Sequence, residues 1–151
     1  MIKNLKKRLK DQRGLTLVEL LAVIVILGII AAIAIPSIGG IIQKTKEDAV
    51  KADAIQIINA AKTYVATHGI PEATNETTPG DIPVANVNQL VEQGSVVLTK
   101  VTAEYDATNN KTIIKITGKG TAGKEEISFV NATVDDINKD KGKGKRNIPN
   151  Q

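Results

Sequence analysis

The chain has 151 residues, which suits one folded domain and leaves no room for two independent cores. Its formal net charge is +4, from 20 Lys and Arg against 16 Asp and Glu. Six of the basic residues and one acid lie within residues 1–14, so the rest of the chain is nearly neutral. The basic total is therefore no evidence for a nucleic-acid-binding surface on the folded part. The absence of cysteine excludes a disulfide framework and a thiolate metal site.

Residues 15–35 form an apolar run of 21 residues with a single charge, Glu19. A helix rises about 1.5 Å per residue, so this run spans roughly 30 Å, the thickness of a bilayer hydrocarbon core. The basic residues before it satisfy the positive-inside rule, which predicts a cytoplasmic N-terminus and a single-pass membrane segment. A secretory signal peptide is the competing interpretation, but its apolar region is shorter, about 7–15 residues.

Residues 36–69 predict a second, amphipathic half of the same helix. Pro36 removes one hydrogen bond and is expected to kink the axis, while Gly69 and Pro71 end the helix. Apolar or small side chains recur at steps of three and four residues, which predicts one buried stripe. Only this half can pack on a globular domain, and the first half is expected to protrude. The predicted stripe consists of Ile38, Ile42, Thr45, Ala49, Ala52, Ile55, Ile58, Ala61 and Val65.

Residues 70–132 predict a small globular domain that begins with a polar, turn-rich loop and a short helix. Three β-branched or alternating segments then predict an antiparallel meander, and the glycine-rich stretch 118–123 is interpreted as one of its turns. The loop is expected at 70–83, the helix at 84–93 and the strands at 96–105, 112–117 and 126–131.

Residues 133–151 end in a Lys-rich, polar segment that is interpreted as too polar to bury, and a flexible tail is expected there. The predicted fold class is therefore α+β. It combines a long kinked helix, whose hydrophobic half protrudes, with a small antiparallel sheet on which the second half packs.

The stretch 13–19, Arg-Gly-Leu-Thr-Leu-Val-Glu, joins a basic segment to the apolar helix. Gly14 at the membrane edge offers a protease an extended bond without a side chain. Glu19 costs a few kcal/mol inside an apolar segment and needs a partner that its own helix does not provide. An acid within a membrane segment is by default interpreted as a functional residue.

This stretch resembles the class III signal of the type IV pilin and pseudopilin family. In that family a short basic leader ends in glycine, and the helix opens with an aromatic or apolar residue, Thr, Leu, any residue and Glu. Leu15 replaces the usual phenylalanine, at a position where the family tolerates Met and Leu. In its lack of cysteine, the chain resembles pilins of single-membrane bacteria and competence-type major pseudopilins. The matching residues are Gly14, Thr16, Leu17, Glu19, Gly28 and Pro36.

The resemblance implies that residues 1–14 are a leader, which a prepilin peptidase removes by cutting between Gly14 and Leu15. It also implies N-methylation of the new Leu15 amine and pairing of Glu19 with the N-terminal amine of a neighbouring subunit. An assembly ATPase and a membrane platform protein then drive the chain into a filament of itself, alone or with minor pilins. The residues expected to bend or melt during assembly are Gly28, Pro36, Gly39 and Gly40.

The predicted function is thus a non-enzymatic structural subunit of a type IV pilus or related filament, with no cofactor or metal. The alternative is a signal-anchored protein with a monomeric extracellular binding domain. An enzyme is disfavoured because the sequence has no nucleophile–base pair, metal-ligand cluster or phosphate loop. DNA binding by the Lys-rich segment is a further alternative without a supporting motif. The sequence leaves open whether the filament serves motility, adhesion, DNA uptake or secretion.

Overall fold

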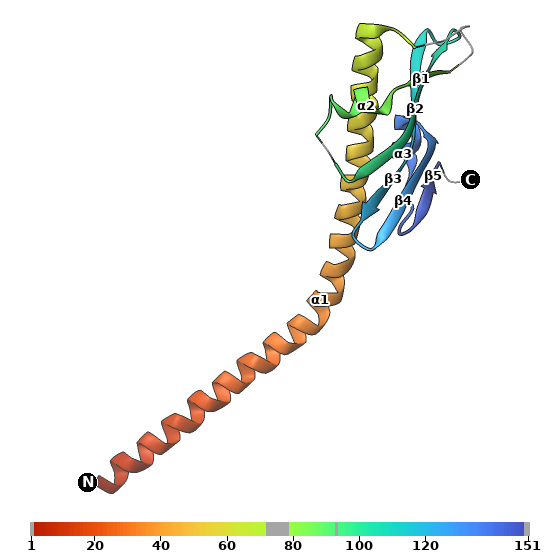
Figure 1. The fold of residues 1–151 in the computed structure, drawn as a ribbon. Coiled ribbons are helices and arrows are strands. Elements are labelled where there is room, and N and C mark those ends of the chain that lie inside the picture. Colours follow the sequence, from red (N-terminus) through yellow and green to blue (C-terminus); the bar gives the residue numbers. More distant parts are fainter. Residues whose placement is uncertain (1, 72–78, 93, 150–151) are drawn as a thin grey trace. The chain divides into compact units, whose positions relative to one another are not determined.

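The computed structural model describes residues 2–71, 79–92 and 94–149, and it describes residues 2–16 by their backbone alone. The chain divides into unit 1, Met1–Ile42, and unit 2, Gln43–Gln151. Helix α1 (Ile2–His68) contributes to both units (Figure 1). It continues through Pro36, so the expected kink there stays a prediction.

Unit 2 contains a five-stranded sheet in the order β1-β2-β3-β4-β5 (Figure 1). Neighbouring strands are antiparallel except β4 and β5, which are parallel. The strands are β1 (Gly80–Ile82), β2 (Val96–Asp106), β3 (Lys111–Ala122), β4 (Glu125–Ala132) and β5 (Arg146–Ile148). The described part of the unit also contains the short helices α2 (Val84–Asn88) and α3 (Val134–Lys139).

The core of unit 2 lies between residues 43–68 of α1 and one face of the sheet. Val50, Ala54 and Ile58 of α1 are almost fully buried together with Ile116 of β3 and Phe129 of β4. Each large side chain of this kind contributes about 1.5–3 kcal/mol when it is removed from water. The α+β class and the small sheet on the second half of the helix are therefore confirmed.

The number of strands and the position of one turn differ from the prediction. The sheet has five strands and a parallel pair, and the stretch 118–123 is largely part of β3 rather than a turn. Gly118 and Gly120 lie where a side chain would not fit: a Cβ on Gly118 would be 2.5 Å from the Val97 carbonyl oxygen, and one on Gly120 would be 2.2 Å from Val50 Cγ1. These glycines serve close packing, and only Gly123, with φ of +68°, has turn geometry.

Over residues 133–149 the structure differs from the polar, flexible tail expected for 133–151, and residues 150 and 151 lie outside the described part. Thr133 begins α3 with a capping box, accepting a hydrogen bond from the Asp136 N–H, and β5 pairs with β4. Ile137 and Ile148 are 1% and 0% exposed and belong to the core. The segment packs on the core despite its polarity because two of its charged residues, Asp140 and Arg146, form ion pairs with α1.

The buried stripe of α1 also differs in phase from the prediction. Ile58 and Ala61 are buried as expected, but Ala49 and Ala52 are exposed. The observed stripe starts at an acid and consists of Glu47, Val50, Ala54, Ile57, Ile58, Ala60 and Ala61. Hydrophobic periodicity does not assign a charged residue such as Glu47 to a core face. The predicted stripe therefore lies on the wrong face of α1 in the first turns of unit 2.

Candidate assembly segment

The residues of the signal motif open the apolar half of α1. The side chains of Gly14, Leu15 and Thr16 lie outside the described part of the structure, which gives only their helical backbone. Leu17 and Glu19 are described, and both are exposed. The structure therefore presents the motif on a helix and leaves its processing untested.

The apolar segment that follows is exposed on every side. Sixteen large apolar side chains between Leu17 and Ile42 have exposed fractions from 47% to 71%. Its mean hydropathy reaches 3.0, and α1 is long and apolar enough to cross a membrane. A helix that is apolar all round is typical of a membrane span or of a helix surrounded by other protein.

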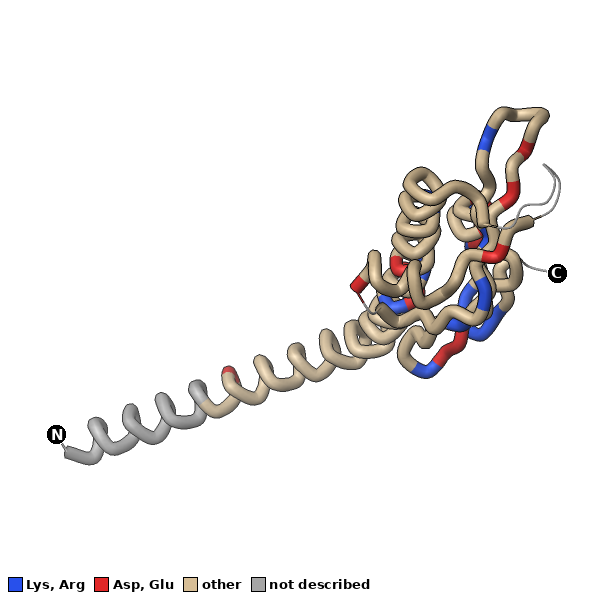
Figure 2. The backbone as a smooth tube through the Cα atoms, turned by 45° about the horizontal axis from the view of Figure 1, so that its top comes forward, with Lys and Arg blue, Asp and Glu red and all other residues tan. Residues whose placement is uncertain are grey.

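Glu19 is the only charge between Leu17 and Ile42, and Figure 2 shows this acidic position on an otherwise uncharged stretch. No described side chain forms an ion pair with it. An acid held in hydrocarbon without a partner costs a few kcal/mol. Its carboxylate is thus available to a cationic group that is not among the described residues of this chain.

The glycines of the predicted flexible stretch are not explained by packing within the chain. A Cβ on Gly28, Gly39 or Gly40 would meet nothing within 4 Å, and none of the three has a positive φ. Glycine in a helix interior is less favourable than alanine by about 0.8–1 kcal/mol. Their use at these positions is consistent with close approach by another helix or with local flexibility.

A cluster that the sequence did not predict joins the C-terminal segment to the start of unit 2. Arg146 Nη1 donates to Glu47 Oε2 at 2.8 Å, and Arg146 Nη2 donates to Asp140 Oδ2 at 2.8 Å. Lys51 Nζ lies 2.7 Å from Asp140 Oδ2, and Gly144 N–H donates to Glu47 Oε1 at 3.2 Å. We call Glu47, Lys51, Asp140 and Arg146 the ion network. Its side chains are at most 15% exposed.

The network changes the pKa of its members. Burial by itself raises the pKa of Asp140, but hydrogen bonds from Arg146 and Lys51 outweigh it and lower that pKa from 3.8 to about 2. Burial likewise raises the pKa of Glu47, while hydrogen bonds from the Gly144 N–H and from Arg146 bring it below its usual value. Glu47 and Asp140 are therefore charged at neutral pH, and the network combines two acidic with two basic side chains.

Comparison with known proteins identifies the motif and the family. Residues 9–35 match the family model described as "Prokaryotic N-terminal methylation motif". The chain is 30% identical over 119 residues to a type IV major fimbrial protein FimA of Dichelobacter nodosus, covering 74% of this chain and 70% of the relative. A second FimA from that organism is 31% identical over 122 residues, with 74% and 71% covered. The chain belongs to the type IV pilin family. No solved structure matches it.

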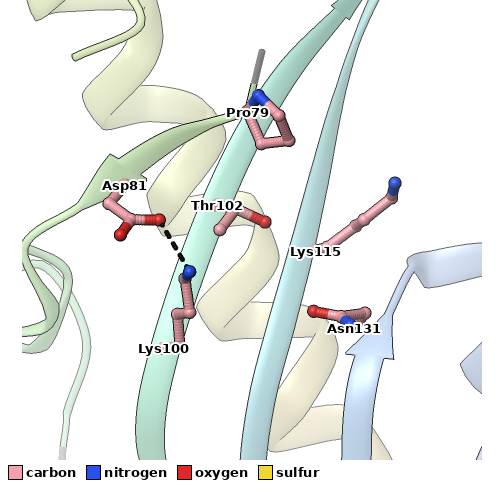
Figure 3. Close-up of a pocket in the computed structure, with 6 residues that line it drawn as sticks. All are labelled: Pro79, Asp81, Lys100, Thr102, Lys115 and Asn131. Carbon is pink, nitrogen blue, oxygen red and sulfur yellow. Dashed lines mark ion pairs between the residues drawn. The ribbon is translucent and has the colours of Figure 1, made fainter. Parts of the chain in front are cut away.

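The globular unit of this pilin also carries a shallow groove of about 460 Å³ on the sheet face opposite α1 (Figure 3). Lys100 Nζ and Asp81 Oδ1 form an ion pair across it at 3.1 Å, and Lys115 pairs with Glu104. Its lysines are thus already compensated. Among the described residues, no group of three or more His, Asp or Glu side chains is arranged to hold a metal ion.

Proposed function

We propose that this pilin is made as a membrane-inserted precursor, is cleaved between Gly14 and Leu15, and polymerises through its N-terminal helix into a surface filament. The observation that carries the proposal is the exposed apolar helix from Leu17 to Ile42 with its single carboxylate. Such a helix needs an apolar environment, first lipid and then copies of itself.

The apolar side chains of unit 1 would make its exposure to water very unfavourable. Each of the sixteen apolar side chains is about half exposed, so covering it contributes on the order of 1 kcal/mol. Their sum exceeds the 5–15 kcal/mol that typically stabilises a whole domain. Water is therefore excluded as the working environment of unit 1. Transfer from lipid to a bundle of identical helices is then close to neutral in hydrophobic energy, so specific contacts decide whether it occurs.

Glu19 supplies one such contact in the proposal. Cleavage would create a positively charged amine on Leu15, and the Glu19 carboxylate of a neighbouring subunit would pair with it. N-methylation keeps the charge of an amine, so the methylated Leu15 would form the same pair. Two opposite charges buried together avoid the cost of leaving each one alone, so the pair would act mainly as a check on register. Assembly would thereby depend on prior cleavage by a prepilin peptidase, with an assembly ATPase and a platform protein as the further expected partners.

The test is mass spectrometry of the mature N-terminus in the host bacterium. We expect a chain that begins at Leu15 with a methylated amine. Replacing Gly14 with leucine should leave an unprocessed precursor in the membrane. Gly28→Leu is the matched control, since it makes the same change within the apolar helix and should be cleaved normally. Normal cleavage of the Gly14→Leu chain would refute the proposed site, and an intact N-terminus in the wild type would favour the anchored monomer.

A further inference from the structure

The last residue of α3 and the loop that joins it to β5 carry lysines without partners among the described residues. Lys139, Lys141, Lys143 and Lys145 are all exposed and alternate with residues that are partly buried. None of them forms an ion pair or hydrogen bond with another described residue. The acids of the ion network are already paired with Lys51 and Arg146, so they do not neutralise these four lysines. We call them the loop lysines.

The ion network holds the backbone of this loop in place. Gly144 N–H donates to Glu47 Oε1 at 3.2 Å, and Gly142 N–H donates to Asp140 Oδ1 at 3.2 Å. Arg146 Nη1 also donates to the Gly144 carbonyl oxygen at 2.8 Å. Because the backbone is already ordered, a partner that binds the loop lysines has only side-chain freedom to restrict.

The loop packs on the first turns of α1 in unit 2, directly after the apolar segment in sequence. Glu47 follows Ile42, the last of the sixteen exposed apolar residues, by five positions, and Gln43 donates to the Ala122 carbonyl oxygen at 2.7 Å. From Leu17 to Ile42 a helix spans about 39 Å, against roughly 40–45 Å for a bilayer with its headgroup regions. Residues 43–47 therefore lie at the level of the headgroups when the apolar segment spans a membrane.

From this position we propose that the loop lysines, with Lys44 and Lys46 of α1, bind anionic lipid headgroups on the outer side of the membrane before assembly. Lys44 and Lys46 are exposed on the same turns of the helix. Outside the ion network, the neighbouring elements carry six acids: Asp48, Asp53, Glu125, Glu126, Asp135 and Asp136. Asp53, Glu126 and Asp136 already accept from Ser95, Lys119 and Thr133, so the six lysines outnumber the three acids that remain. The inference rests on the proposed membrane insertion. The contact would hold unit 2 against the bilayer and would have to break when a subunit enters the filament.

The test compares the reactivity of lysines in the full chain inserted in lipid nanodiscs. One set of discs has neutral lipid only, and the other contains about one-third phosphatidylglycerol. A water-soluble acylating reagent labels exposed amines, and mass spectrometry measures each site. We expect the loop lysines to react at least threefold more slowly in the anionic discs. This protection should disappear at about 0.5 M NaCl, where the Debye length is only a few Å.

Lys111 is the internal control. It is exposed, and it begins β3, whose other end, Ala122, lies next to Gln43. Twelve residues of strand place it roughly 36 Å from that end, which pairs with Glu125 next to Gly144, so within unit 2 it is distant from the loop lysines. Its labelling rate should be the same in both kinds of disc. The K141Q/K143Q/K145Q variant should reduce the protection of Lys139, whereas K111Q should not.

Equal labelling of the loop lysines in neutral and anionic discs would overturn the inference while leaving membrane insertion intact. Protection by added duplex DNA but not by anionic lipid would overturn it in favour of a nucleic-acid surface. A chain that is washed out of the discs by alkaline carbonate would refute the proposed membrane insertion itself and this inference with it.

Discussion

Replacing Arg146 with methionine tests whether the ion network stabilises unit 2. The guanidinium is 8% exposed and donates to both Asp140 and Glu47, whereas methionine keeps only the apolar stem. Breaking a buried ion pair by removing one partner costs about 3–5 kcal/mol, because the other charge is left buried and uncompensated. Asp140 retains Lys51 at 2.7 Å, so we expect the lower end of that range, about 3 kcal/mol.

The matched control is Lys100→Met, which removes the cation of an exposed ion pair. Lys100 and Asp81 are 54% and 69% exposed, and pairs of this kind contribute about 0–1 kcal/mol. Thermal unfolding of the full chain in detergent micelles, followed by circular dichroism, measures both variants. A loss of about 3 kcal/mol lowers Tm by roughly 10–20 °C for a unit of this size. If both variants lose the same stability, the buried network is not what holds the C-terminal segment.

Two further predictions concern unit 2. The lowered pKa of Asp140, about 2 against 3.8, corresponds to stability on the order of 2 kcal/mol. That stability is fully present above pH about 5 and is lost as the pH falls through 2, and acid titration followed by circular dichroism measures it. In Gly120→Ala the new Cβ would lie 2.2 Å from Val50 Cγ1, so we expect about 1–3 kcal/mol of destabilisation in urea unfolding, and an unchanged midpoint would contradict the close helix–sheet contact.

Much of the architecture could be predicted because its signals are local. The apolar run, the positive charges before it and the Gly14–Glu19 motif are contiguous in the sequence, and the 3.6-residue period continues to the end of α1 at His68. The three longer strands were also predicted near their observed positions, since β-branched residues and alternation mark them without reference to the rest of the chain.

The errors share a physical cause, which is pairing between distant residues. The sequence places Arg146 in a Lys-rich run that is expected to be solvated. Its partner Glu47 lies 99 residues earlier, on a helix position that the sequence predicts to be at the surface. Each is unfavourable to bury alone, and only the fold brings them together. The same holds for Gly120, which reads as a turn residue until Val50 of α1 is seen to lie against it. A charged residue is therefore predicted correctly as exposed only when the fold brings no opposite charge next to it.

The two acids Glu19 and Glu47 lie on one helix, and they differ in whether the chain itself provides a cationic partner. Glu47 has its cation within the chain, at 2.8 Å, whereas no described residue supplies one to Glu19. We therefore expect Glu47→Gln to lower the thermal stability of unit 2, because Arg146 loses a partner, and to reduce filaments only through that loss. Glu19→Gln should leave the unfolding midpoint of unit 2 unchanged and N-terminal processing intact, yet reduce the filaments sheared from cells at least tenfold. Glu92→Gln, an exposed acid of unit 2, should change neither quantity. Wild-type filament yield from the Glu19→Gln chain would mean that the partner of this carboxylate is not a neighbouring subunit.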